Sequence, residues 1–167
     1  MVIHMIKNET ELKKIYGDYY DDEQYTTNGI DYRLKDVSIL VEKTQSTNTE
    51  LKYIGIVDNK KTLPNYIPLQ DSDGIYHFRA GRYYMWDLGK HQIPDDAIAM
   101  FWLRSTIMRC GGVLNSSVAD RGFNGTISVG FYCHNNVSIS KNERVVQAVF
   151  FNSNDDGNTY DGDYQEE

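Results

Sequence analysis

The chain has 167 residues, 40% of them hydrophobic and 25% charged, and 24 acidic against 17 basic side chains give a formal net charge of -7. We expect one domain spanning residues 1–167, because this length suffices to bury a core. The acidic balance argues against a nucleic-acid partner, since that affinity comes mainly from Lys and Arg on phosphates. No run approaches the roughly 18 apolar residues of a membrane span, so we expect no membrane partner and a cytoplasmic location.

Cysteine and histidine give no sign of a metal centre. Cys110 and Cys133 have no metal-ligand spacing and are too few for a disulfide framework. The four histidines are scattered, without a pair at helical spacing or a neighbouring cysteine. The sequence therefore predicts no metal held by protein side chains.

The first 26 residues are predicted to form one short helix and an acidic connector. Apolar positions recur among Lys and Glu from Ile6 to Tyr20, with Asn8 or Thr10 available as the N-cap and Gly17 as the end. We expect this to be the only substantial helix.

From Ile30 onward, alternation and β-branched residues predict a series of short strands. The predicted strands span residues 30–34, 37–41, 51–57, 74–79, 82–86, 97–102, 113–118, 126–132 and 144–151. Polar turns are expected at 44–49, 58–61 and 93–96, and the last two strands are expected to pair through a turn at Asn135 and Asn136. Many short strands with almost no helix favour an all-β barrel or jelly-roll-like sandwich.

One glycine-rich segment, residues 102–125, holds the candidate site. Arg104, Ser105, Thr106 and Arg109 place two guanidinium groups and two hydroxyls within six residues, a set suited to phosphate oxygens. Arg104 directly follows an apolar strand, and a buried arginine requires an anionic partner. Gln147 lies in another apolar run, where either a backbone group or a phosphate is needed to satisfy it.

Asp120 is the candidate general base. It follows Ser105 by fifteen residues, with a turn at Gly111 and Gly112 between them, so it is expected near the phosphate cluster of its own or a neighbouring subunit. A carboxylate beside a polyanion is suited to activating water towards phosphorus. The competing interpretation is a plain turn residue at the head of Asp-Arg-Gly-Phe.

Residues 152–167 are polar and acidic, which is typical of a frayed tail. Tyr160 and Tyr164 lie within this segment, and two aromatic residues there favour a flexible lid that orders over a ligand.

Taken in order, these motifs resemble the trimeric dUTPase and dCTP deaminase superfamily, and within it most closely the archaeal and phage dUTPases that carry a deaminase-like pattern. The resemblance covers most of the chain and rests on Gly29–Leu34, Gly81–Tyr84 with Ile93–Ile98, Arg104–Arg109, Asp120–Gly125, Arg144–Phe151 and Tyr160–Gln165. It implies a distorted jelly-roll or β-barrel of the trimeric dUTPase type. It also implies a homotrimer with active sites at its subunit interfaces.

The same resemblance implies a role for each candidate residue. Arg104, Ser105, Thr106 and Arg109 would bind the phosphates with help from Gln147, and Asp120 would orient or deprotonate the attacking water. The nucleoside pocket would comprise Asn115, Ser116, Val118 and Phe123, with Phe123 under the deoxyribose. Tyr160, Tyr164 and Gln165 would form the lid, Mg²⁺ would arrive with the triphosphate, and Asp31 would be structural rather than catalytic.

Departures from the family pattern bear on the activity. Relatives that deaminate dCTP carry a Glu ten positions after the motif Asp, where this chain has Gly130, and glycine cannot move a proton. The expected activity is therefore hydrolysis of dUTP to dUMP and pyrophosphate. Asp163 and the acidic end of the chain would repel a triphosphate, so a nucleotide-binding or regulatory protein without turnover is the alternative. Deamination is the third hypothesis.

Overall fold

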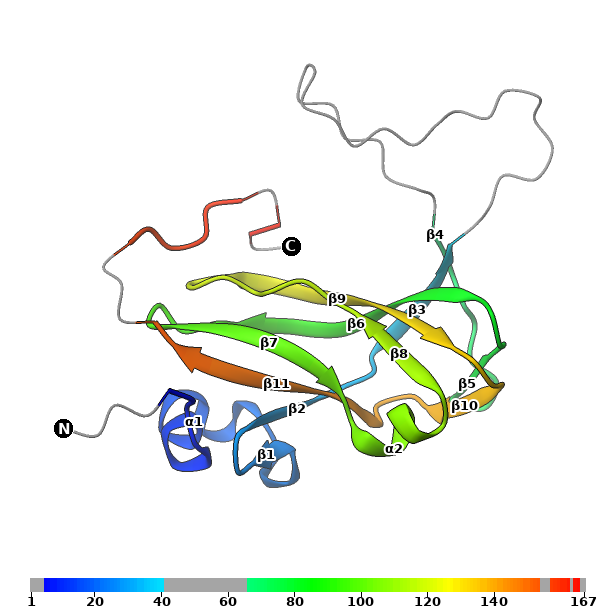
Figure 1. Cartoon of the computed structure of the whole chain (residues 1–167), viewed down its shortest axis with the longest axis horizontal. Helices are drawn as coiled ribbons and strands as arrows, with labels where there is room; N and C mark the ends of the chain where they lie inside the picture. The colour runs from blue at the N-terminus through cyan, green and yellow to red at the C-terminus, as the bar shows by residue number, and fades with distance from the viewer. Residues whose placement is uncertain (1–4, 41–65, 154–156, 163, 166–167) are drawn as a thin grey trace, which may run out of the picture.

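The computed structural model describes residues 5–40, 66–153, 157–162 and 164–165 (Figure 1). The expected strand at 51–57, the turns at 44–49 and 58–61, and the acidic residues Asp163, Glu166 and Glu167 lie outside these ranges.

The expected N-terminal helix is confirmed as α1 (Glu9–Tyr16). Asn8 caps it by accepting a hydrogen bond from the Glu11 amide, and the Glu11 carboxylate accepts one from the Asn8 amide in return. Gly17 ends the helix with a φ of 52°, which glycine adopts without steric cost. Two short 3-10 turns, η1 (Gly17–Tyr19) and η2 (Asp22–Gln24), then lead the chain to the first strand.

Two antiparallel sheets form the body of the molecule, which Figure 1 shows as two layers. The four-stranded sheet has the order β1 (Tyr25–Thr26), β2 (Gly29–Arg33), β11 (Arg144–Asn152) and β7 (Ala97–Leu103). The five-stranded sheet has the order β4 (Tyr66–Pro68), β3 (Asp36–Leu40), β6 (Tyr83–Gln92), β9 (Asn124–Cys133) and β8 (Gly112–Asn115). A third pair joins β10 (Val137–Ser140) to β5 (Ile75–Phe78). The all-β jelly-roll class is therefore confirmed.

Alternate residues of the central strands face the space between the sheets and form its core. Trp86 of β6 stacks on Phe131 of β9 with ring centroids 3.9 Å apart, and both side chains are fully buried. Tyr32 and Phe150 are fully buried in the opposite sheet. Each such side chain contributes about 1.5–3 kcal/mol to folding, so the apolar alternation read from the sequence is what holds the layers together.

Three details differ from the sequence-based expectation. The strands β9 and β11 do not pair with each other, because β9 lies between β6 and β8 while β11 lies between β2 and β7. The chain between them forms β10, a short strand that the turn residues Asn135 and Asn136 obscured. A second, five-residue helix, α2 (Ser105–Arg109), occupies the predicted phosphate-binding segment.

Candidate active site

The predicted phosphate-binding residues lie together at the corner where β7 ends. Arg104 is the N-cap residue of α2, and Ser105, Thr106 and Arg109 on this helix are exposed. Two guanidinium groups and two hydroxyls therefore lie together at one corner of the protein. We call this group of Arg104, Ser105, Thr106 and Arg109 the cationic corner. This arrangement fits the expected contacts with phosphate oxygens.

Asp31 of β2 holds Arg104 in place. Its carboxylate is 95% buried and lies 3.0 Å from Arg104 Nε and 3.8 Å from Arg144 Nη1. Burial raises the pKa of the Asp31 carboxyl, and the charges of the two arginines oppose this shift. Asp31 is thus the nearer anionic partner of the half-buried Arg104, whose Nη1 also lies 3.8 Å from Glu143 Oε1, and it belongs to a strand 73 positions earlier in the sequence.

A β-bulge brings the second arginine to the same place. The register between β11 and β2 shifts between Arg144 and Val146, so that Val145 and Val146 are both buried. A bulge redirects the side chains beside it, and here Arg144 reaches the Asp31 carboxylate. The sheet itself therefore positions the cationic corner.

Gln147 has a partner within the protein. It pairs in register with Asp31 on one side and Trp102 on the other, and its Nε2 donates to Thr26 Oγ1 at 2.7 Å. The hydroxyl of Thr26 therefore supplies the hydrogen-bond partner that this half-buried side chain needs. The sequence had predicted a backbone group or a phosphate in that role, and a side-chain hydroxyl was not considered.

Asp120 lies away from the cationic corner of its own chain. Ala119 pairs with Ala99 near the start of β7, whereas Arg104 follows the end of that strand. Five residues of strand at about 3.3 Å each separate Ala99 from Arg104 by roughly 16 Å. Asp120 is exposed near the start of β7, so within one subunit it does not belong to the cluster at the end of that strand.

Asp120 begins a tight turn that the C-terminal segment covers. The Phe123 amide donates to the Asp120 carbonyl oxygen at 3.2 Å, and Gly122 has a φ of 70°. A side chain at Gly122 would also crowd Thr159 of the C-terminal segment. Glycine is therefore required at this position both by the turn and by the close approach of the chain.

The described part of the lid packs against this turn. The Tyr160 amide donates to the Arg121 carbonyl at 2.7 Å, and its ring meets the buried Phe123 edge-on with centroids 5.3 Å apart. Gln165 accepts from the Asn124 amide at 3.1 Å and donates to the Gly122 carbonyl at 3.2 Å. Tyr160 and Gln165 of the predicted lid therefore lie beside Phe123, the predicted sugar residue of the same chain.

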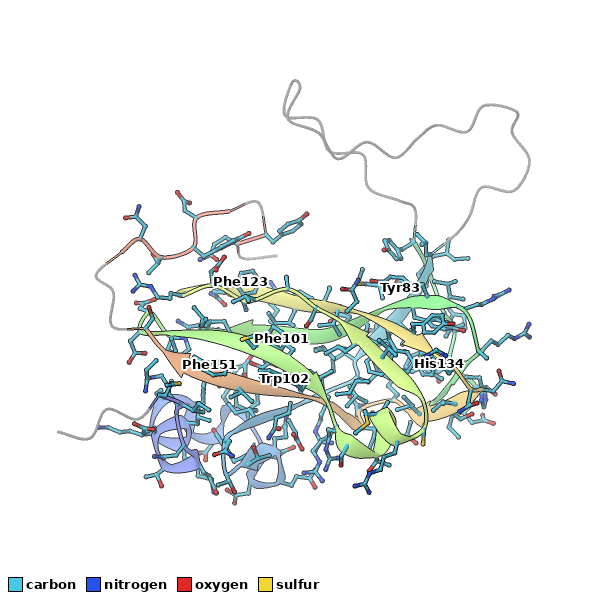
Figure 2. All side chains as sticks on the ribbon, viewed as in Figure 1. Tyr83, Phe101, Trp102, Phe123, His134 and Phe151 are labelled. Atoms are coloured by element: carbon cyan, nitrogen blue, oxygen red, sulfur yellow. The ribbon has the colours of Figure 1, made fainter. Side chains whose placement is uncertain are left out.

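Tyr164, the third lid residue, is exposed, and its amide donates to the Tyr160 hydroxyl at 3.3 Å. Of the remaining pocket residues, Asn115 ends β8 and donates from Nδ2 to the Tyr83 hydroxyl at 3.1 Å, while Ser116 and Val118 follow the strand and are exposed. Sequence reasoning missed the contact between Tyr83 and Asn115. Nothing in the segment Gly81–Tyr84 indicates which neighbouring strand the Tyr83 side chain reaches. In Figure 2, Tyr83 and Phe123 mark the two ends of β9.

The described residues contain no group of three or more His, Cys, Asp or Glu side chains arranged to hold a metal ion. Over the same residues, no helix is long and apolar enough to cross a membrane.

Comparison with known proteins places this chain within a family. The family model described as dCTP deaminase-like matches residues 3–153. A protein of Methanopyrus kandleri named as a probable deoxyuridine 5'-triphosphate nucleotidohydrolase is 32% identical over 96% of this chain and 99% of its own. The deoxyuridine 5'-triphosphate nucleotidohydrolase of Methanocaldococcus jannaschii is 27% identical over 91% of this chain and 94% of its own.

A solved structure shares the fold. The 2'-deoxycytidine 5'-triphosphate deaminase of Agrobacterium tumefaciens superposes with a TM-score of 0.64 at 13% identity, over 89% of this chain. This chain spans about half of that protein, 48% of its length. Because the family model covers nearly all of the sequence, the chain belongs to the dCTP deaminase-like family.

Proposed function

We propose that this protein is a dUTP pyrophosphatase, which hydrolyses dUTP to dUMP and pyrophosphate. The observation that carries the proposal is the exposed cationic corner of Arg104, Ser105, Thr106 and Arg109, fixed from beneath by the buried Asp31. The names of the archaeal relatives, which match over nearly their full length, support the same activity. A cytoplasmic location stays a prediction.

Hydrolysis of the triphosphate requires the protein to position the attacking water and to stabilise negative charge on the phosphate oxygens. A water molecule, oriented or deprotonated by Asp120, attacks the α-phosphorus; a new P–O bond forms and the bond from that phosphorus to the bridging oxygen breaks. Pyrophosphate leaves with the electron pair of that bond. Arg104 and Arg109 would stabilise the negative charge that accumulates on the phosphate oxygens.

Magnesium would reach the site with the substrate. Mg²⁺ prefers oxygen ligands and keeps several of its waters, so triphosphate oxygens suit it without a cage of protein carboxylates. When bound, it would neutralise part of the phosphate charge.

We further propose that the active protein is a homotrimer whose sites are shared between subunits. The separation of Asp120 from Arg104 along β7 supports this assembly, because a shared site would place the Asp120 of one subunit beside the Arg104 of its neighbour. A face of the four-stranded sheet also supports it. By alternation with the buried residues of β7 and β11, the outward positions hold Ile98, Met100, Trp102, Val149 and Phe151. Trp102, labelled with Phe151 in Figure 2, is 46% exposed. The other four are half-buried, and apolar side chains that stay partly exposed side by side commonly mark an interaction surface.

Two activities compete with this proposal. Deamination would need a proton-transferring side chain at position 130, which is Gly130. Nucleotide binding without turnover is favoured by the exposed carboxylate of Asp161 in the lid segment, which would repel a triphosphate.

Pyrophosphate release should be measured from dUTP, dCTP, dTTP and UTP, with and without Mg²⁺. We expect selective, metal-dependent cleavage of dUTP that Asp120→Asn abolishes, while Asp18→Asn, which alters an exposed carboxylate of the N-terminal connector, leaves it intact. Binding of dUTP without release of pyrophosphate would favour the non-catalytic alternative. Ammonia released from dCTP would favour deamination.

A further inference from the structure

Lys7 is a buried lysine that the proposed chemistry does not use. Its side chain is 6% exposed, and its Nζ donates to Asp96 Oδ2 at 2.9 Å. The side chain of Asp96, in contrast, is 68% exposed. Lysine is almost never buried unless its charge is paired, so the burial of Lys7 has to be explained by what its partner does.

The backbone at Lys7 is fixed on the four-stranded sheet. Ile6 forms a bridge with Phe151 of β11, and the Lys7 amide donates to the Phe150 carbonyl at 2.9 Å. Asp96 lies in the turn that joins β6 to β7, at the same end of the molecule as α1 (Figure 1). The ammonium group therefore extends from a fixed backbone to a turn 89 positions later in the sequence.

The turn at residues 93–96 is bonded to two other parts of the chain. The Asp96 carbonyl accepts a hydrogen bond from the Ser153 amide at 2.8 Å, just where the C-terminal segment begins. The Pro94 carbonyl accepts one from the Gly122 amide at 3.4 Å. The turn that Lys7 holds is thus bonded directly to the turn that Asp120 begins.

Asp120 depends on this part of the chain on both of its sides. Ala119, which precedes it, exchanges two backbone hydrogen bonds of 2.9 Å with Ala99 of β7. On the other side, the Phe123 carbonyl accepts from the Ile93 amide at 2.7 Å. The segment from Ile93 to Ala99 therefore fixes the backbone before and after the candidate base.

An ion pair of this kind contributes little to the stability of a fold. Taking a charge out of water costs about as much free energy as the attraction provides, and an apolar side chain of similar size is often as stable. Lys7→Met would also leave no buried charge behind, because Asp96 is exposed. The pair is therefore better suited to fixing the place of an exposed turn than to stabilising the core.

We propose that Lys7 is a positioning residue for Asp120: by holding Asp96 it fixes the turn at residues 93–96, against which the turn of the candidate base rests. The inference rests on the proposed function and adds to it a residue near the start of the chain. Lys7 acts through Asp96 and not on the nucleotide. Its loss slows the chemical step and leaves binding at the cationic corner, which follows the other end of β7, unchanged.

The kinetic test compares Lys7→Met with Lys7→Arg in the full chain. In Lys7→Met we expect kcat for dUTP to fall about tenfold or more with KM unchanged, because a misplacement of about 1 Å at a reacting group can cost about a hundredfold in rate. Lys7→Arg keeps the charge and should restore most of the rate. Lys13→Met, which removes the exposed ion pairs with Glu9 and Asp22, is the matched control and should keep the wild-type kcat.

Hydrogen exchange separates positioning from general stability. In Lys7→Met the amides of Gly122 and Ser153, which bond to the turn, should exchange faster, while the Ala119 amide in the bridge to β7 exchanges as before. The unfolding temperature should hardly change, because no buried charge is left unpaired. A loss of kcat that accompanies a large fall in unfolding temperature, and that Lys7→Arg does not restore, would overturn the positioning role in favour of a purely structural one.

Failure of this inference can be told apart from failure of the proposed function. If the wild-type protein cleaves dUTP and Lys7→Met keeps the full kcat, the positioning role is overturned while the activity stands. If the wild-type protein cleaves no nucleotide, hydrogen exchange decides. Faster exchange at Gly122 and Ser153 in Lys7→Met supports the hold of Lys7 on the turn, and unchanged exchange at both overturns it.

Discussion

The Asp31 carboxylate and the Arg104 guanidinium form an ion pair of 3.0 Å that joins β2 to the end of β7 across β11. The carboxylate is almost fully buried, whereas about a third of the Arg104 side chain is exposed. Asp31 thus holds the guanidinium at Nε, while Nη1 lies 3.5 Å from the Arg144 carbonyl oxygen and 3.8 Å from Glu143 Oε1. We infer that Asp31 positions the side chains that the proposed function assigns to phosphate binding.

Replacing Asp31 with Asn should weaken substrate binding more than it weakens the fold. A hydrogen bond to a charged group contributes about 1.5–3 kcal/mol, so kcat/KM for dUTP should fall at least about tenfold, mainly through KM. Steady-state kinetics and the unfolding temperature would be measured together. Asp36→Asn, which removes the carboxylate of the exposed Lys141 pair, is the control. An unchanged KM would contradict the positioning role.

Two inactive variants should restore each other if the site is shared. Co-expression of Arg104→Ala and Asp120→Asn subunits with different tags would yield mixed trimers, in which an intact Arg104 and an intact Asp120 meet at some interfaces. If equal amounts of the two subunits assemble at random, each half of a shared site is intact with a probability of one half. Both halves are then intact at about a quarter of the interfaces, so about a quarter of wild-type activity should return. If Arg104 and Asp120 of one chain served the same site, every subunit of the mixture would stay inactive.

The outward face of β7 should form part of the interface that holds the subunits of the proposed trimer together. Trp102→Glu places a charge on the apolar surface, and sedimentation velocity should show a shift from trimer to monomer accompanied by loss of pyrophosphate release. Ile15→Glu on α1 changes an equally exposed apolar side chain, 45% against 46%, and should leave the assembly intact. A Trp102→Glu trimer with full activity would locate the interface elsewhere.

Stability should fall below neutral pH because of His91. Burial lowers the pKa of His91 from 6.5 to about 4, and its ring lies between the Tyr20 hydroxyl and the Leu88 carbonyl. Between these two pKa values the unfolded chain binds a proton that the native protein does not. The free energy of unfolding should therefore decrease by roughly 3 kcal/mol as the pH falls from 7 to 4.

The control for this pH effect is a second histidine. His91→Phe keeps a ring against Tyr32 and should flatten the dependence of the unfolding free energy on pH, although the protein becomes less stable at pH 7. His77→Phe changes an exposed histidine and should retain the slope. Equal slopes in the wild type and His91→Phe would assign the effect to other groups.

Gln165 should couple the lid to the Asp120 turn. Gln165→Ala removes both hydrogen bonds to Gly122 and Asn124, so hydrogen exchange at the Asn124 amide should accelerate and KM for dUTP should rise. The unfolding temperature should hardly change, because surface substitutions usually alter stability by less than about 0.5 kcal/mol. Gln70→Ala, in an exposed loop, should alter none of these. Unchanged exchange at Asn124 would show that the lid is not held by Gln165.

Local features of the sequence predicted the local structure well. Asn8 and Gly17 cap the two ends of α1 through the backbone next to them, so the bounds of this helix could be inferred from the sequence. Apolar alternation located most strands within two or three residues of their observed ends. The pairing of β9 and β11 with other strands could not be inferred in this way. It depends on which sheet each strand joins, and alternation is the same in either sheet.

The residues of the candidate site were predictable only where they are neighbours in the sequence. Arg104 and its neighbours are contiguous in the sequence, which is why their grouping could be predicted. Asp31 and Tyr83 meet their partners only through sheet register, at separations of 73 and 32 positions. The sequence indicated that Arg104 needs an anion, but only the register of β2 against β11 identifies the carboxylate that supplies it.

The placement of Arg104 and Asp120 towards opposite ends of β7 has a consequence for how the rate depends on the amount of protein. If the two halves of each site come from different subunits, a newly made subunit is an inactive precursor. Specific activity would then rise steeply with protein concentration near the dissociation constant of the assembly and level off above it. A cell could hold the activity near zero simply by keeping expression below that threshold.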